Sequence, residues 1–145
     1  MPTVLQPNLT VPYGMFDYTL GRAHQLWIAG GIGIAPFLSW LAALDPQDPY
    51  RIDLFYSAST AADAVYLAEL RAAERRLGSL LRVHPVFTRA EGQLTGEKVA
   101  ALAEVSPDTH AFLCGPSAMV DALSRDLHRA GVPREHIHAE HFAFR

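Results

Sequence analysis

The sequence contains one cysteine, Cys114, in 145 residues. A single thiol excludes a disulfide within the chain and is typical of a protein from a reducing compartment. Clusters of basic residues are also missing, and the formal net charge is −3. This charge balance argues against nucleic acid or an anionic membrane surface as the main partner. We see no internal repeat and no low-complexity tract.

Long apolar runs are absent too. A membrane-spanning helix takes about 20 consecutive apolar residues, and the longest candidate, 26–44, is interrupted by three glycines and a proline. The N-terminal stretch has no basic segment followed by an apolar one, so we expect no signal peptide. With 50% hydrophobic and 19% charged residues, the composition is that of an ordinary globular protein, and the length suits one domain with one core.

Short apolar segments alternate with helical patterns along most of the chain. The expected strands cover 25–30, 51–58, 80–87, 109–115 and 136–142. The expected helices cover 35–44, 60–78, 94–105 and 116–131. This alternation predicts an α/β fold: a doubly wound parallel five-stranded sheet with strand order 3-2-1-4-5 and helices on both faces. We interpret 1–24 as a linker or interdomain lead-in and 25–145 as the domain.

The segment "AGGIGIAP" at 29–36 follows the first expected strand and opens the first expected helix. Such a bend leaves backbone N–H groups at the start of a helix, where they favour an anion such as a pyrophosphate. Gly30, Gly31 and Gly33 would let phosphates approach the backbone because they carry no Cβ. Pro36 occupies the place where a dinucleotide fingerprint has its third glycine, so a plain strand–turn–helix bend is the alternative.

The segment "LCGPSAM" at 113–119 places the lone thiol of Cys114 at the end of the fourth expected strand. In an open parallel sheet, ligands bind beyond the carboxyl ends of the strands. A thiol there is a nucleophile if a neighbouring base lowers its pKa, or a redox group, or a small buried hydrophobic residue. The residues alone leave these three readings open.

Five segments in this order form a more specific pattern: "PYGMF" (12–16), "GGIGIAP" (30–36), "FYSASTAAD" (55–63), "FLCGPSAM" (112–119) and "EHFAFR" (140–145). Together they resemble the NAD(P)H-binding domain of the ferredoxin–NADP reductase superfamily, over about residues 12–145. Within it, the pattern is most similar to the ferric reductase and NADPH oxidase branch, as in bacterial predicted ferric reductases. The resemblance implies an oxidoreductase domain that binds NADH or NADPH and delivers hydride to FAD.

The same resemblance implies a role for each matching residue. The residues expected to bind the cofactor are Gly30, Gly31, Gly33, Ile34, Pro36, Ser57, Ser59, Tyr66, Thr88, Gly115, Pro116 and Met119. The catalytic positions would be Cys114, which orients the nicotinamide without attacking it, Glu140 near the two rings, and Phe142, which covers the flavin until nicotinamide displaces it. Tyr13 and Gly14 would lie at the junction with the flavin domain. Simple strand packing is the alternative for Phe142, and an exposed strand position for Glu140.

The resemblance also implies parts that these residues do not supply. No segment matches a flavin-binding barrel or the membrane helices of the ferric reductase branch. We therefore expect a cytoplasmic domain of an inner-membrane protein, with its flavin domain and a haem-bearing transmembrane domain elsewhere in the same chain. This part alone should have little activity. The alternatives are a soluble reductase component of the flavin or ferredoxin type and a nucleotide-sensing module without catalysis.

We expect the end of the second expected strand to determine whether NADH or NADPH binds. The resemblance puts Ser59 where an arginine often pairs with the 2′-phosphate of NADPH. A serine offers one hydroxyl in place of a bidentate guanidinium, so we expect NADH to be favoured, with Arg89 as the alternative cation. Tyr66 could stack on the adenine. Asp63 forms a T-x-x-D pattern with Thr60, which predicts a capping box for the following helix.

The segment "HIHAEHF" at 136–142 contains residue types that bind zinc. On a strand, His136, His138 and Glu140 share one face, whereas His141 points to the other. We expect His136 to precede the strand and Glu140 to serve the nicotinamide, and we therefore expect no metal site.

Overall fold

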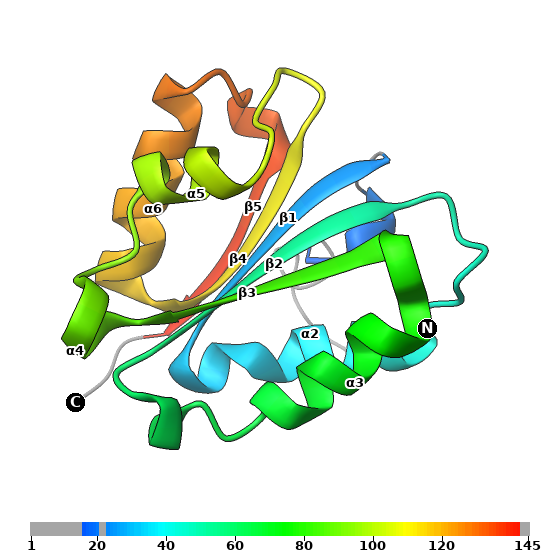
Figure 1. Ribbon diagram of the computed structural model, residues 1–145. Coiled ribbons are helices and arrows are strands. Elements are labelled where there is room, and N and C mark those ends of the chain that lie inside the picture. Colours follow the sequence, from blue (N-terminus) through cyan, green and yellow to red (C-terminus); the bar gives the residue numbers. More distant parts are fainter. Residues whose placement is uncertain (1–15, 21–22, 143–145) are drawn as a thin grey trace.

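The computed structural model describes residues 16–20 and 23–142, and a sheet of five parallel strands runs through its centre (Figure 1). The strands are β1 (His24–Gly30), β2 (Arg51–Ala58), β3 (Leu81–Phe87), β4 (His110–Pro116) and β5 (Ile137–Phe142). Their order across the sheet is β3-β2-β1-β4-β5, and every neighbouring pair is parallel. The predicted sheet and its strand order are confirmed.

Helices cover both faces of this sheet, as predicted (Figure 1). One face carries α2 (Ala35–Ala43) and α3 (Leu67–Leu77), and the other carries α5 (Gly96–Leu102) and α6 (Ser117–Arg129). The shorter elements are α4 (Thr88–Glu91) and the 3-10 turns η1 (Tyr18–Leu20), η2 (Gly31–Ile34), η3 (Ala61–Asp63), η4 (Gly78–Leu80) and η5 (Arg134–His136).

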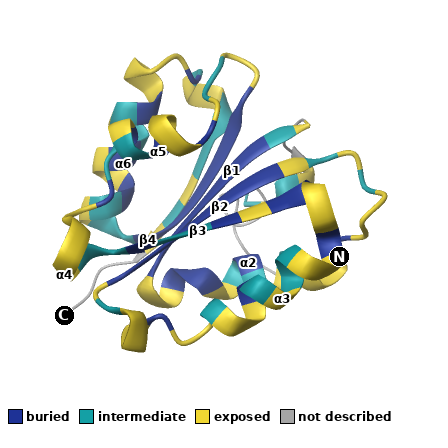
Figure 2. Cartoon of the chain, in the orientation of Figure 1, coloured by how far each residue is buried: buried dark blue, intermediate teal, exposed yellow. Residues whose placement is uncertain are grey.

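Alternate residues of each central strand contribute to opposite cores. In β1, Trp27 and Ala29 belong to the apolar cluster on the side of α2 and α3, whereas Leu26 and Ile28 belong to the cluster on the side of α5 and α6. All four side chains are fully buried, and Figure 2 shows that burial is concentrated in the strands. A parallel sheet has both faces covered, which explains why its central strands are nearly continuous apolar runs in the sequence.

The segment expected to form one helix over 60–78 differs most from the prediction. It is divided into η3 and α3, because Ala64 has ψ of 65° and leaves the helical region. Ala64 is 5% exposed and belongs to the core, so its packing overrides the helix propensity of the segment. Thr60 Oγ1 donates to Asp63 Oδ2 at 3.0 Å. Within the described chain Thr60 caps no backbone N–H with its side chain, so the predicted capping box is wrong.

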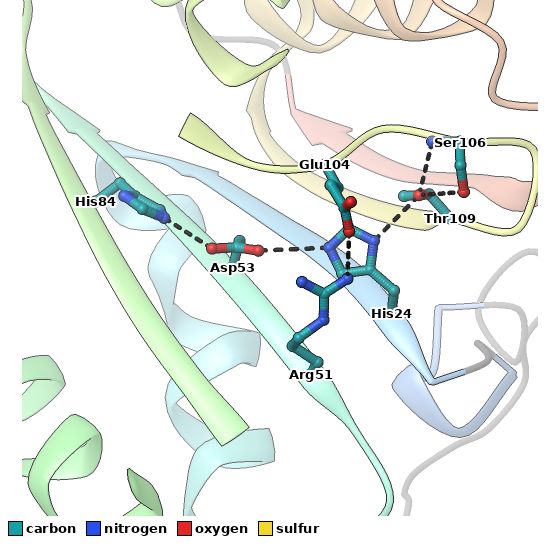
Figure 3. A network of polar contacts seen from close by, with 7 residues as sticks. All are labelled: His24, Arg51, Asp53, His84, Glu104, Ser106 and Thr109. Carbon is teal, nitrogen blue, oxygen red and sulfur yellow. Dashed lines mark hydrogen bonds and ion pairs between the residues drawn. The ribbon is translucent and has the colours of Figure 1, made fainter. Parts of the chain in front are cut away.

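Near the amino-terminal ends of the central strands, Asp53 connects two histidines (Figure 3). Asp53 is 4% exposed. Its Oδ1 lies 2.8 Å from His84 Nε2, and its Oδ2 lies 3.4 Å from His24 Nε2. His24 Nδ1 continues the network to Thr109 Oγ1 at 3.2 Å. Burial by itself raises the pKa of the Asp53 carboxyl, but hydrogen bonds and charges of the two histidines outweigh it and hold that pKa well below its usual range.

We expect Asp53→Asn to lower the free energy of unfolding by about 1–3 kcal/mol near neutral pH, because the partners of a buried carboxylate lose an acceptor. The folded pKa of Asp53 lies below the unfolded one. Its stabilisation is therefore present above the unfolded pKa of about 4 and is lost as the pH falls through the folded value. Urea denaturation from about pH 6 to about pH 3 should show a weaker pH dependence for Asp53→Asn than for the wild type. The exposed Asp121→Asn is the control, and equal slopes in Asp53→Asn and the wild type would contradict the prediction.

Candidate functional site

A cavity of about 590 Å³ opens at the carboxyl ends of β1, β2 and β4. The chain winds outward from β1 in two directions, toward β2 and toward β4, and such a switch point is where open α/β sheets bind ligands. The cavity is lined by Gly30, Gly31, Ser57, Ala58, Ser59, Asp63, Thr88, Gln93, Leu94, Pro116, Ala118, Met119 and Ala122. Seven of these are predicted cofactor-binding residues: Gly30, Gly31, Ser57, Ser59, Thr88, Pro116 and Met119.

Two glycines make room for Met119 at one side of the cavity. A Cβ on Gly30 would lie 2.8 Å from Met119 Sδ, and a Cβ on Gly115 would lie 2.7 Å from Met119 Cε. Both distances are shorter than side-chain contacts allow, so a larger residue at either strand end would require Met119 to move. The thioether therefore lies directly against backbone, where it closes the space between β1 and β4.

The bend between β1 and α2 contains a turn that was not expected from the sequence. Gly31 begins η2 with φ of +55°, a left-handed conformation that favours glycine. Gly33 is buried, and a Cβ there would overlap the carbonyl oxygen of Cys114 and lie 2.6 Å from its carbonyl carbon. Ile34 is 1% exposed in the core, and Pro36 is in the first turn of α2. Gly33, Ile34 and Pro36 thus shape the bend without lining the cavity.

The thiol of Cys114 lies in the core, away from the cavity. Cys114 is 6% exposed and sits between Ala29 of β1 and Glu140 of β5 in the sheet register. Burial, with the charge of Glu140 as the smaller cause, raises the pKa of the thiol to about 11. At neutral pH roughly one thiol in ten thousand is then a thiolate. This argues against the nucleophile reading and agrees with a small buried residue.

The other two predicted catalytic residues lie on β5. Glu140 is half-buried, and burial raises the pKa of its carboxyl although the nearby His141 lowers it. Phe142 ends β5 and is paired with Pro116 of β4 in the sheet register. The side chain of Phe142, and residues Tyr13 and Gly14, lie outside the part of the chain that the structure describes.

Residues around the end of β2 separate into two groups. Ser59 and Asp63 line the cavity. Tyr66 is 40% exposed just before α3 and borders a separate groove of about 410 Å³ between α2 and α3. Arg89 is exposed in α4, and its backbone N–H donates to the Ser59 carbonyl oxygen at 3.0 Å. The start of α4 therefore lies beside the end of β2, close to the hydroxyl and carboxylate that face the cavity.

Several lining residues were missed by sequence reasoning. Gln93 and Leu94 reach the cavity from the loop between α4 and α5, and Ala118 and Ala122 reach it from α6. Asp63 had a usable signal, because an acidic residue after the second strand of a dinucleotide fold often meets a ribose, but the capping interpretation concealed it. Gln93 and Leu94 had no local signal in the sequence, because only the fold decides whether a loop residue lines a cavity.

The histidines near β5 contribute to packing between strands. His136 precedes β5, as predicted. His110 Nδ1 lies 3.2 Å from His138 Nε2, and the rings of His110 and His136 stack with centroids 3.9 Å apart. Among residues 16–20 and 23–142, no three side chains of His, Cys, Asp or Glu gather as metal ligands would.

We expect Gly33→Ala to lower the free energy of unfolding by about 2–4 kcal/mol, because its Cβ would force the bend away from Cys114. Gly31→Ala is the matched comparison, because no atom lies within 4 Å of its added Cβ. Only its left-handed backbone conformation should then lower the free energy of unfolding, by about 1–2 kcal/mol. Urea denaturation of both variants measures the difference. Equal losses would show that the close approach of Gly33 does not limit stability.

The raised pKa and the burial of Cys114 predict a thiol that reacts slowly in the folded protein. At neutral pH, labelling by a maleimide should be at least roughly tenfold slower in buffer than in denaturing urea. The rate should rise with pH toward the thiol's pKa of about 11. Fast labelling of the folded chain near pH 7 would contradict the assignment.

Known proteins are similar to this chain in sequence and in fold. A family model described as the oxidoreductase NAD-binding domain matches residues 27–125. The carnitine monooxygenase reductase subunit of Escherichia coli is 29% identical over 136 residues, which are 94% of this chain and 40% of that protein. NADH-cytochrome b5 reductase 1 of Meyerozyma guilliermondii is 31% identical over 134 residues, which are 85% of this chain and 47% of that protein. The structure of a flavohaemoglobin from Malassezia yamatoensis, with bound FAD and haem, has a TM-score of 0.75 at 20% identity and covers 94% of this chain and 35% of that one.

The chain thus spans less than half the length of these relatives. The similarity to the flavohaemoglobin concerns the fold alone, whereas the family model covers the strands and helices that surround the cavity. The relatives named here are a monooxygenase reductase and a cytochrome b5 reductase, so the expected ferric reductase and NADPH oxidase branch gains no support. The chain belongs to the oxidoreductase NAD-binding domain family, as the NAD-binding domain of the ferredoxin–NADP reductase superfamily.

Proposed function

We propose that this chain is the nucleotide-binding part of an NADH-dependent reductase, and that it presents the nicotinamide to a flavin held on a separate domain. The observation that carries the proposal is the cavity at the switch point of the sheet. Its lining includes seven residues that the motif pattern assigns to the cofactor. Membership of an NAD-binding family agrees with that assignment.

Among the alternatives for the whole protein, a reductase component that serves an oxygenase or a cytochrome is favoured. Relatives with these names match 85–94% of the chain. The ferric reductase alternative calls for a haem-bearing membrane domain and a place at the inner membrane. Among the residues that the structure describes, no helix could span a bilayer. Neither named relative is a ferric reductase, and we therefore propose the reductase component.

The cavity suits a dinucleotide because it combines bare backbone with hydroxyl groups. Gly31 offers a surface without side chains, because no atom lies within 4 Å of the position of its Cβ, whereas Met119 lies over Gly30. The helix α6, 13 residues long, begins at the cavity with Ala118 and Met119 in its first turn. Its dipole places partial positive charge on that side of the cavity, which favours an anionic nucleotide. Ser57 and Thr88 supply hydroxyls toward the riboses.

We propose that the end of β4 positions the nicotinamide. Pro116 lines the cavity, and the neutral thiol of Cys114 lies behind it in the core, so this wall carries no nucleophile to compete with hydride transfer. Met119 packs against the glycine backbone in the same corner. We propose that Glu140, half-buried on the next strand and outside the cavity lining, holds a proton near the rings. Flavin, when bound by its own domain, accepts the hydride.

Discrimination against NADPH rests on the end of β2. Asp63 and Ser59 line the cavity, and among the described residues that line it none is arginine or lysine. The 2′-phosphate of NADPH would therefore meet the carboxylate of Asp63, and repulsion between like charges is unfavourable. Arg89, the alternative cation, is exposed on α4 and does not line the cavity. A ribose 2′-hydroxyl can instead donate a hydrogen bond to Asp63. We propose that the nucleotide is NADH.

We expect the chain to bind NADH roughly five- to tenfold more tightly than NADPH at low ionic strength, and the ratio to narrow at high salt. Titrations followed by nucleotide fluorescence measure both constants. Asp63→Asn should narrow the ratio by improving NADPH binding, whereas the exposed control Asp121→Asn should leave it unchanged. Equal wild-type affinities would refute the NADH preference, and absence of binding by either nucleotide would refute the proposed function.

A further inference from the structure

One wall of the cavity is formed by a loop and not by the ends of the strands. Gln93 and Leu94 belong to the loop between α4 and α5, and both line the cavity. Gly92, with φ of +83°, turns the chain at the start of this loop. Leu94 is anchored in the apolar cluster on the side of α5 and α6, but Gln93 is exposed and depends on the backbone for its place.

Lys98 fastens this loop through its side chain. Its Nζ donates to the Glu91 carbonyl oxygen at 2.7 Å and to the Gln93 carbonyl oxygen at 2.9 Å. A Cβ on Gly92, between these two residues, would lie 3.6 Å from the same nitrogen. The ammonium group therefore closes the turn on which Gln93 stands. Lys98 is held in turn, because its backbone N–H donates to Thr95 Oγ1 at 3.2 Å.

The first turn of α5, which carries Lys98, is attached to α6, another element that lines the cavity. The Gly96 backbone N–H donates to Asp126 Oδ2 at 3.0 Å, and a Cβ on Gly96 would overlap the Cβ of Asp126. Asp126 belongs to α6, whose first turns line the cavity with Met119 and its neighbours. The loop and α6, which both line the cavity, are thus connected through α5.

Lys98 is also the only lysine of the sequence, in which the remaining basic residues are arginines. An ammonium group on a flexible stem has three donors and can meet two carbonyl oxygens that lie in different directions. The planar fork of arginine has more donors but less freedom to turn. The chemistry of the contact thus agrees with the residue that occupies it.

We propose that Lys98 is a positioning residue for the nucleotide: by bonding the carbonyl oxygens of Glu91 and Gln93, it holds the wall formed by Gln93 and Leu94 against the bound ligand. This inference rests on the proposed function, since the ligand is the nicotinamide nucleotide. Lys98 acts through the loop and does not itself line the cavity. Loss of its two bonds should loosen the wall and weaken binding while the core of the domain stays intact.

Three variants of the full chain test this role. Lys98→Met should raise the dissociation constant for NADH roughly three- to tenfold. The loop would then have to be ordered when NADH binds, and this ordering makes the free energy of binding less favourable. Lys98→Arg, which keeps donors and charge, should recover at least half of that loss on a logarithmic scale. Arg75→Met removes one exposed positive charge from α3, away from the cavity, and should bind like the wild type. The urea midpoints of all three should stay close to that of the wild type.

A single lysine offers a second readout on the unmodified protein. Labelling with ¹⁵N-lysine yields one backbone amide resonance, that of the Lys98 N–H bonded to Thr95 Oγ1, and its absence from Lys98→Arg confirms the assignment. We expect this resonance to shift as NADH is added. Saturation by NADH without a shift, or wild-type affinity in Lys98→Met, overturns the positioning role while the proposed function stands. Failure of the wild type to bind NADH overturns both.

Discussion

The backbone of Gly33 lies against the carbonyl group of Cys114, and no side chain fits between them. This contact joins the turn that follows β1 to the end of β4, the two strands between which the switch point lies. It determines where α2 begins and how closely the two glycine-rich strand ends approach each other. Met119 then fills the remaining gap over Gly30 and Gly115. The shape of the cavity follows from a backbone contact that a single methyl group would prevent.

The two ends of the sheet have different chemistry for a related reason. At the carboxyl ends, glycines and short hydroxyl side chains leave open space for a ligand. At the amino-terminal ends, the buried carboxylate of Asp53 is hydrogen-bonded to His24 and His84, and His24 is hydrogen-bonded in turn to Thr109 (Figure 3). A buried charge is tolerated when it is fully hydrogen-bonded. That end of the sheet therefore contributes to stability, and the other end is left free for binding.

The parallel sheet and its strand order could be predicted because local patterns carry them. Apolar runs such as 51–58 become strands, and Gly78, with φ of 63°, ends α3. Most of the cavity lining was also within reach, because Gly30 and Pro116 end a strand, Ser59 follows one, and parallel strands end on one side of the sheet. The division of the expected helix 60–78 was not, since it depends on the burial of Ala64 by residues distant in the sequence.

By itself, the sequence determined the alternation of strands and helices and the residue types at the strand ends, because periodicity and turn chemistry are local properties. Only the tertiary structure decided which of those residues share a cavity. It turned Gly33 into a close contact with Cys114 instead of a lining residue, and it placed Asp63 beside Ser59. It also brought Lys98 to the loop that forms one wall. Where these residues stand relative to the cavity depends on how segments far apart along the chain come together, and packing of the whole domain decides that.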